Sequence, residues 1–246
     1  MPGWALVTGA ARRIGRTLAL TAARSGHDVV VHHRALAAEA AETVALIEAL
    51  GRRAMAAPAD LCDPAECRRL VAEAPGPLTL LVNCASLFEE DRIQTLTAEG
   101  WDATQSANLR APVLLSQAFA AALPLGRDGL IVNIIDQRVL KPTPHFFSYA
   151  VSKAGLWAAT RMLAQGLAPR IRVNAIAPGP TLPSIHQSAE AFAAEAGAVI
   201  LGQGPSPEEI GHALAYLIDA SSVTGQMIAV DGGQHLSWRT PDVVGP

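Results

Sequence analysis

The chain has 246 residues, of which 50% are hydrophobic, 17% are charged and 4% are aromatic. This composition excludes intrinsic disorder, collagen-like repeats and coiled coils, and the length fits a single domain over residues 1–246. A net charge of −3 with scattered arginines provides no field for nucleic acid. Three cysteines without metal-ligand spacing predict no metal site, and short apolar runs predict no membrane span, so we expect a cytoplasmic protein with a small-molecule ligand.

Short apolar runs alternate along the chain with alanine-rich stretches of helical length. The expected strands lie at 4–7, 29–31, 53–56, 78–82, 130–135, 173–176 and 227–230. The expected helices lie near 13–25, 36–50, 63–74, 98–123, 150–167 and 207–219, the last one beginning at the capping sequence Ser206-Pro207-Glu208-Glu209. This alternation predicts an α/β, Rossmann-like, doubly wound parallel sheet of about seven strands with helices on both faces. We expect the segment 181–204, rich in small residues, to form a mobile substrate lid.

The first expected strand leads directly into the turn Thr8-Gly9-Ala10-Ala11-Arg12-Arg13-Ile14-Gly15, followed by a helix. A turn of this kind points free backbone N–H groups and the positive end of a helix at a phosphate. We therefore expect Gly9, Ile14 and Gly15 to hold a dinucleotide. Arg13 adds a cation that can touch both the pyrophosphate and a substrate. The alternative is a glycine-bearing turn without a ligand.

The residues after the second strand indicate which dinucleotide is bound. NAD-preferring folds usually carry an acidic residue about 20 positions beyond the glycine turn. This chain has His32-His33-Arg34 there, with no carboxylate to repel a 2′-phosphate and an arginine able to bind it. NADPH is therefore the expected cofactor, unless Arg34 is simply a solvated cation. Asp60 and Leu61, after the third strand, are expected to receive the adenine.

The fourth strand is followed by Asn83-Cys84-Ala85-Ser86, and we expect Asn83, Ala85 and Ser86 to line the nicotinamide side of the crevice. Phe88 comes next, at a position where its ring can stack on a flat heterocycle. A lone phenylalanine is also a common core residue, so both interpretations stay open. The acidic run 89–91 that follows is interpreted as a solvated turn.

Tyr149 and Lys153 are four residues apart in an expected helix, so they share a face. We expect the ammonium group to favour the phenolate and to lower the pKa of Tyr149 from about 10, which suits a general acid. A surface pair on an amphipathic helix is the alternative. Asp136, at the end of the fifth strand, can accept or donate a proton and so join a proton relay; otherwise it is a solvated loop residue.

These motifs together resemble the short-chain dehydrogenase/reductase family over nearly the whole chain. They are Thr8-Gly9-x3-Arg13-x-Gly15, Asn83-Cys84-Ala85-Ser86, Asn108, Tyr149-x3-Lys153 and Pro178-Gly179. Most members have glycine where this chain has Arg13 and serine where it has Asp136. Both departures, with His32-x-Arg34, resemble the pteridine reductase branch of the family.

The resemblance implies further roles. Lys153 would hold the nicotinamide ribose hydroxyls, and Asn108 would kink its helix and support a water-filled proton path. Pro178, Gly179 and Thr181 would contact the cofactor. Members of the family are commonly tetramers, so a homotetramer is expected, with interfaces that involve the helices near 98–123 and 150–167 and the C-terminal strand.

The combined prediction is an NADPH-dependent reductase of a pterin or folate, with hydride transfer to a C=N bond and Tyr149 as proton donor. Arg13, Ser86, Phe88 and Asp136 would contact the substrate. One alternative is a carbonyl or 3-oxoacyl-thioester reductase, in which the tyrosine protonates an alkoxide. An alternative of another class is a regulator that senses NADPH without catalysis, against which the paired tyrosine and lysine argue.

Overall fold

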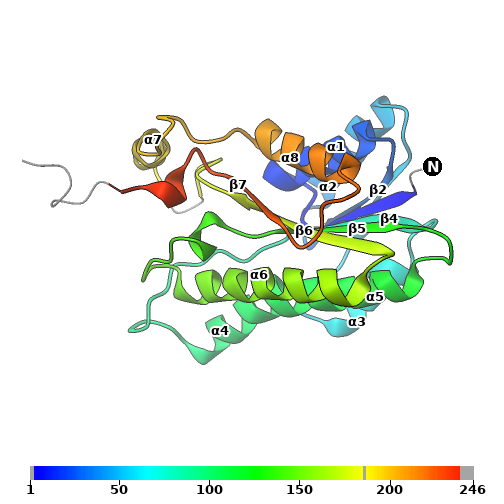
Figure 1. The fold of residues 1–246 in the computed structure, drawn as a ribbon, viewed down its shortest axis with the longest axis horizontal. Helices are drawn as coiled ribbons and strands as arrows, with labels where there is room; N and C mark the ends of the chain where they lie inside the picture. Colours follow the sequence, from blue (N-terminus) through cyan, green and yellow to red (C-terminus); the bar gives the residue numbers. More distant parts are fainter. Residues whose placement is uncertain (1–2, 185–186, 239–246) are drawn as a thin grey trace, which may run out of the picture.

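The computed structural model describes residues 3–184 and 187–238, and within these ranges seven strands form one parallel sheet (Figure 1). The strands are β1 (Trp4–Val7), β2 (Asp28–His33), β3 (Ala54–Pro58), β4 (Leu78–Asn83), β5 (Gly129–Ile134), β6 (Ile171–Pro178) and β7 (Met227–Val230). Their order is β3-β2-β1-β4-β5-β6-β7, so the direction of strand addition reverses between β1 and β4. A ligand crevice is expected at such a switch point, at the carboxyl ends of the strands.

Helices cover both faces of the sheet. They are α1 (Arg13–Arg24), α2 (Ala37–Ala49), α3 (Pro64–Ala72), α4 (Ala98–Gln105), α5 (Ala111–Ala122), α6 (Phe147–Leu167), α7 (Ala189–Gly197) and α8 (Pro207–Asp219). Figure 1 shows α1, α2 and α8 on one face and α3, α4, α5 and α6 on the other. The capping sequence predicted for the last helix is confirmed, because Ser206 and Glu209 form a reciprocal capping box at the start of α8.

Side-chain alternation in β1 explains why the sheet is buried on both faces. Ala5 and Val7 belong to a core cluster with residues of α1 and α8, whereas Trp4 and Leu6 belong to a second cluster with residues of α3 and α5. Successive strand side chains point to opposite faces, so a strand covered on both sides needs an uninterrupted apolar run. The expected fold, including the strand number, is confirmed.

The helix expected over 98–123 is interrupted. It consists of α4, a π-helical turn (Ser106–Arg110) and α5. Pro112 lies in the first turn of α5 and has no N–H group to donate to the carbonyl of Asn108, four residues earlier. The wider turn accommodates this missing hydrogen bond. The interruption includes Asn108, and the expectation of a single continuous helix was wrong.

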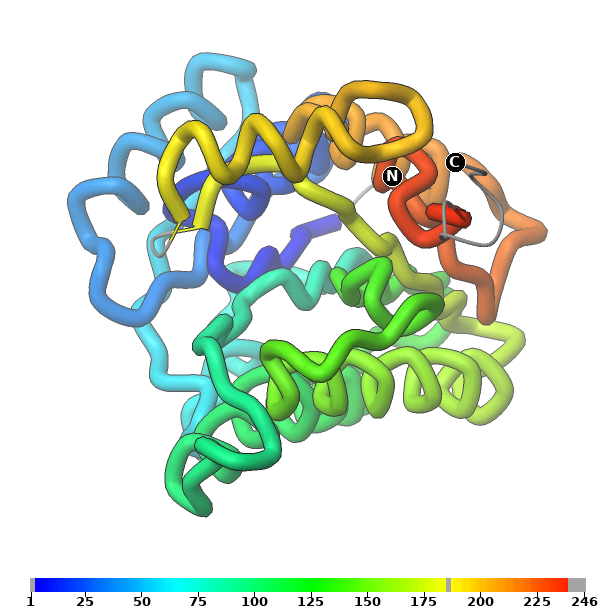
Figure 2. Tube along the Cα trace, turned by 90° about the vertical axis from the view of Figure 1, so that its left-hand side faces the viewer, coloured from blue at the N-terminus to red at the C-terminus, as the bar shows by residue number. Residues whose placement is uncertain are grey.

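The segment expected to be a lid contains a helix of its own. Ser188 caps α7 by accepting a hydrogen bond from the Ala191 N–H group. Figure 2 shows α7 in yellow, on the same side as the blue N-terminal segments and opposite the green segments of α4, α5 and α6. No residue of α7 is buried, so the helix lies on the surface. Its action as a lid stays a prediction.

Candidate active site

A cleft of about 790 Å³ lies at the carboxyl ends of the strands. Most of the predicted site residues line it: Gly9, Arg13, Ile14, Gly15, His32, Arg34, Asp60, Leu61, Ala85, Ser86, Phe88, Asp136, Tyr149, Lys153, Pro178, Gly179 and Thr181. The fold therefore brings together residues that are separated by most of the chain. In the described ranges no cluster of His, Cys, Asp or Glu could hold a metal ion, and no helix is long and apolar enough to cross a membrane.

Two predicted residues, Asn83 and Asn108, lie behind the cleft wall instead. Asn83 is buried and its amide donates to Asn133 Oδ1 at 2.8 Å, while Asn133 donates to Thr160 at 2.9 Å. Asn83 was expected to line the nicotinamide side, but its side chain links β4 to β5 and α6. Asn108 exchanges two hydrogen bonds of 2.8 Å with the backbone of Leu87. It therefore fixes the segment that follows β4.

The glycine turn is held by His32. The Gly9 N–H group donates to His32 Nδ1 at 3.0 Å, and His32 Nε2 lies 3.2 Å from the carbonyl oxygen of Ala59. Because Nδ1 accepts, the ring proton is on Nε2, which donates to Ala59. Burial lowers the pKa of His32 to about 4, so the ring is neutral at physiological pH. One imidazole thus joins the turn after β1 to the ends of β2 and β3.

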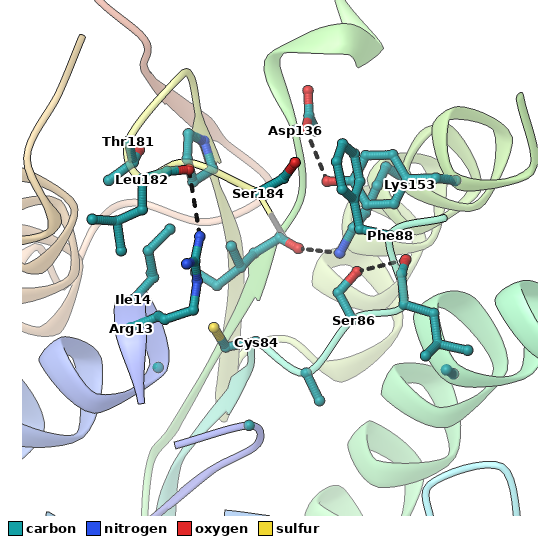
Figure 3. Close-up of a pocket in the computed structure, with 18 of the residues that line it drawn as sticks. Arg13, Ile14, Cys84, Ser86, Phe88, Asp136, Lys153, Thr181, Leu182 and Ser184 are labelled. Atoms are coloured by element: carbon teal, nitrogen blue, oxygen red, sulfur yellow. Dashed lines mark hydrogen bonds between the residues drawn. The ribbon is translucent and has the colours of Figure 1, made fainter. Parts of the chain in front are cut away.

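Close packing shapes the same turn. A Cβ atom on Gly15 would lie 2.1 Å from the carbonyl oxygen of Gly9, so only glycine fits there. Arg13 adopts a left-handed backbone with φ of 57°, a conformation that glycine adopts more readily. Its guanidinium donates to the carbonyl oxygens of Pro183 at 2.8 Å and Leu182 at 3.4 Å. Arg13 therefore ties the glycine turn to the segment after β6 (Figure 3).

Tyr149 and Asp136 form a hydrogen-bonded pair in the cleft, and the bond is the dashed line that begins at Asp136 in Figure 3. The Tyr149 hydroxyl donates to Asp136 Oδ2 at 2.8 Å. Lys153 Nζ lies 5.5 Å from the centre of the Tyr149 ring and donates to the carbonyl oxygen of Ile134 at 2.9 Å. All three ionisable groups belong to one buried cluster, in which the carboxylate is the direct partner of the phenol.

This arrangement changes the expected ionisation of the tyrosine. Burial, followed by the charge of Asp136 and its hydrogen bond, raises the pKa of Tyr149 well above its usual value. The predicted lowering by Lys153 was therefore wrong for this geometry. Burial also lowers the pKa of Lys153 to about 8. The phenol remains protonated at neutral pH and is available as a proton donor.

Asp136 is held in place by Arg138. The Arg138 backbone N–H donates to Asp136 Oδ1 at 2.8 Å, and its guanidinium lies 3.2 Å from Oδ2. The aspartate side chain is 12% exposed, which is far from a solvated loop residue. Its carboxylate thus has a fixed orientation toward the phenol, and the alternative of a solvated position does not apply.

Aromatic rings form one side of the cleft. Phe88 stacks on Phe146 with ring centres 4.3 Å apart and an interplanar angle of 9°, and it meets Tyr149 edge-on at 4.7 Å. The Arg138 guanidinium lies 5.8 Å from the Phe88 ring centre and 5.5 Å from that of Phe146. Phe146 has a left-handed backbone with φ of 54°. Phe146 was not predicted, although its position three residues before Tyr149 was a usable signal.

Asp91 caps the helix that carries the tyrosine. Its carboxylate accepts hydrogen bonds from the Ser148 N–H group at 3.0 Å and from the Ser148 hydroxyl. Its backbone carbonyl accepts from the Phe147 N–H group at 3.2 Å. These contacts satisfy donors at the start of α6 that have no partner within the helix. The solvated turn expected at 89–91 is therefore wrong for Asp91.

The chain matches a known protein family over most of its length. The family described as "Enoyl-(Acyl carrier protein) reductase" matches residues 9–235. A "Short-chain type dehydrogenase/reductase" from Picea abies is 33% identical over 94% of this chain and 91% of that protein. The chain belongs to the short-chain dehydrogenase/reductase family. It is accordingly an oxidoreductase, as the Tyr149-x3-Lys153 pair predicted.

Two further relatives bear on the kind of short-chain reductase. The structure of "FolM Alternative dihydrofolate reductase 1" from Brucella canis, complexed with NADP, is 48% identical with a TM-score of 0.93, covering 98% of this chain and 97% of that one. A "3-oxoacyl-[acyl-carrier-protein] reductase" from Staphylococcus aureus strain MW2 is 30% identical over 94% of this chain and 98% of that protein. The resemblance to a pterin and folate branch is thus supported beside a broader likeness to other short-chain reductases.

Proposed function

We propose that this protein is an NADPH-dependent reductase of a pterin or dihydrofolate-type substrate. The observation that carries the proposal is the 2.8 Å hydrogen bond between Tyr149 and Asp136, the residue that replaces the serine of most family members. Arg13 and Phe88 line the same cleft. The 48% identity to an alternative dihydrofolate reductase over nearly the full chain supports the same substrate class.

The residues around the glycine turn fit NADPH. Gly9, Ile14 and Gly15 line the cleft at the start of α1, where backbone N–H groups and the positive end of the helix suit a pyrophosphate. Arg34 lines the cleft beyond β2, where no carboxylate opposes a 2′-phosphate. Lys153, Asp60 and Leu61 line the same cleft, and we infer that Lys153 holds the nicotinamide ribose while Asp60 and Leu61 receive the adenine. When bound, NADPH supplies the hydride.

Tyr149 and its neighbours perform the proton transfer. The raised pKa keeps the phenol protonated, so it can donate to the substrate nitrogen beside the carbon that accepts hydride. Lys153, whose pKa is about 8, is largely an ammonium group at neutral pH and stabilises the phenolate that forms. Asp136 accepts a hydrogen bond from the phenol or from an N–H group of the substrate, and Arg138 fixes its orientation.

Phe88 lines the cleft with one ring face stacked on Phe146, and we infer that its second face receives a flat substrate. A pterin ring placed against that face would lie on the aromatic side of the cleft, with Asp136 and Tyr149 at its edge. Arg13 is on the opposite side (Figure 3). A flat ring with several hydrogen-bonding groups at its edge matches this combination of aromatic surface and charged groups.

The deciding experiment follows NADPH oxidation with dihydropterins, dihydrofolate, simple ketones and a 3-oxoacyl thioester. We expect turnover of a pterin or dihydrofolate, competed by a diaminopteridine antifolate. Asp136→Ser, which restores the common family residue, should reduce pterin turnover more than any residual ketone turnover. No competition by the antifolate, with unchanged or improved turnover in Asp136→Ser, would show that the substrate is not a pterin.

The second candidate is a carbonyl or 3-oxoacyl-thioester reductase. The likeness to the staphylococcal 3-oxoacyl reductase over almost the whole chain favours it. The same panel separates the two candidates, because turnover of the ketone or thioester without turnover of a pterin selects the second one.

A further inference from the structure

Arg16 lies near the start of α1, and its guanidinium reaches back to the glycine turn. Its Nε and Nη2 atoms donate to the carbonyl oxygen of Ala11 at 3.1 and 2.8 Å. The hydroxyl of Thr43, on α2, lies 3.0 Å from the same oxygen. One carbonyl group of the turn is therefore held by side chains from two different helices.

Thr43 is placed for this contact by the packing of α2. The buried residues of this helix, which the structure describes in full, are Ala40, Thr43 and Ile47, and their spacing puts them on one face. Thr43 is 0% exposed, so its hydroxyl needs a partner within the protein. It also accepts a hydrogen bond from Arg16 Nε at 3.0 Å. The two side chains thus form one polar connection between α1 and α2, the Arg16–Thr43 bridge.

The Arg16–Thr43 bridge lies behind the cleft. Neither of its residues lines the cleft, whereas Ala11 and Arg12 do. The peptide between Ala11 and Arg12 is planar and trans, so the carbonyl of one and the N–H group of the other point in opposite directions. Holding the carbonyl toward the helices therefore turns the N–H group away from them. This N–H group forms no hydrogen bond with any residue that the structure describes, as is usual where a helix begins.

A connection between the two helices does not by itself require the contact with Ala11. Arg16 also donates to the backbone carbonyl of Glu39 at 3.1 Å and to the exposed carboxylate of Glu42 at 2.9 Å, and these contacts already join α1 to α2. The additional hydrogen bonds to Ala11 fix a residue of the turn. The other end of the turn is held by His32. The peptide after Ala11 is therefore oriented from both sides in the absence of a ligand.

We propose that Arg16 and Thr43 are positioning residues for NADPH, which orient the Arg12 N–H group toward a phosphate of the cofactor. A donor that is oriented in advance costs little conformational entropy on binding, whereas a mobile turn has to be ordered by the ligand. The Arg16–Thr43 bridge therefore raises the affinity for the cofactor and leaves hydride and proton transfer unchanged. The proposal depends on the cofactor, and the identity of the substrate does not enter it.

The test measures the dissociation constant for NADPH without substrate, from the fluorescence of the bound nicotinamide. Arg16→Met keeps the aliphatic chain and removes the donors, and it should raise this constant about tenfold, the factor that corresponds to one hydrogen bond. Thr43→Val should raise it as well, and Arg16→Lys, which keeps a donor, should recover part of the affinity. Arg24→Met is the matched control, because Arg24 is exposed in the last turn of the same helix and lies outside the cleft. It should bind NADPH like the unmodified protein.

Steady-state kinetics distinguish positioning from a general loss of structure. With Arg16→Met the KM for NADPH should rise while kcat at saturating NADPH stays unchanged, whichever substrate of the panel above is turned over. The double variant with Thr43→Val should raise the dissociation constant by less than the product of the two single factors, because both side chains hold one oxygen. All variants are measured well below their Tm. An unchanged dissociation constant in Arg16→Met, even with a lowered Tm, or a kcat that falls as much as the affinity, would overturn the proposal.

Discussion

The Tyr149 hydroxyl donates a hydrogen bond to a carboxylate in this structure, at the position where most of the family has a serine. An ionised aspartate can only accept from the phenol, so it keeps the phenolic proton directed along the cleft wall. We therefore expect Tyr149 to act as a proton donor rather than as a general base. The nearby ammonium group of Lys153 would stabilise the phenolate that remains after the proton has been transferred.

Removing the phenolic hydroxyl tests this assignment. Tyr149→Phe keeps the ring and its contact with Phe88, and we expect the rate of reduction to fall about 10²–10⁴-fold, the usual contribution of a positioned general acid. The dissociation constant for NADPH should change little. Tyr216→Phe is the control, because Tyr216 is exposed on α8. Full turnover in Tyr149→Phe at neutral pH would mean that another group protonates the substrate.

His32 gives the fold a pH dependence whose sign follows from its neutral state. Its pKa is about 4 in the folded protein and 6.5 in the unfolded chain, so the unfolded state binds the proton more readily. The contribution of His32 to the unfolding free energy is fully present above pH 6.5 and is lost as the pH drops toward 4. This contribution is at most about 3 kcal/mol. His32→Asn keeps an acceptor for the Gly9 N–H group without titrating. Urea unfolding measured at several pH values between 4 and 6.5 should show that the unfolding free energy depends less steeply on pH in the variant. An equally steep pH dependence in both proteins would contradict the assignment.

At the scale of elements, α6 depends on a residue outside it. The helix begins after Phe146, whose left-handed backbone turns the chain sharply, and Asp91 supplies the acceptors for the first free N–H groups. The segment between β4 and α4 thereby fixes the start of the helix that carries Tyr149. Asn108 fixes the same segment from the other side through the Leu87 backbone. The aromatic side of the cleft and the proton donor are therefore positioned together.

Asp91→Ala should accordingly affect both stability and turnover. Loss of a capping carboxylate costs about 0.5–2 kcal/mol of unfolding free energy, which denaturant titration measures. We expect kcat to fall more than NADPH affinity, because Tyr149 shifts while the glycine turn does not. Asp91→Asn keeps one acceptor and should recover part of both losses. Glu90→Ala, at the exposed neighbour, should change stability by no more than about 0.5 kcal/mol.

At the scale of the whole molecule, the parallel sheet was predictable because strands buried on both faces need continuous apolar runs. The short helix α7 escaped prediction because none of its residues is buried, so no apolar face marks it in the sequence. The interruption of the helix at Pro112 was hidden by a long alanine-rich pattern.

The site could be predicted where a side chain is chemically distinctive and comes directly after a strand. Asp136 is of this kind, whereas Tyr149 and Lys153 were predicted from their spacing of four residues within a helix. The direction in which the Asn83 side chain points and the stacking of Phe146 on Phe88 depend on the detailed path of the backbone. The spacing of motifs in the sequence does not predict that path. The homotetramer, with its interfaces, stays a prediction.

The strand order has a consequence for synthesis on the ribosome. From β4 onward each new strand is added at the same growing edge, and β5 has an open edge until β6 has been made. The 36 residues between Ile134 and Ile171 take roughly 2–7 s to translate at about 5–20 residues per second. During that interval the nascent chain exposes an apolar strand edge that favours pairing with other chains. Gln234 also lines the cleft, so the lining of the cleft is complete only after β7 and the residues that follow it have been made.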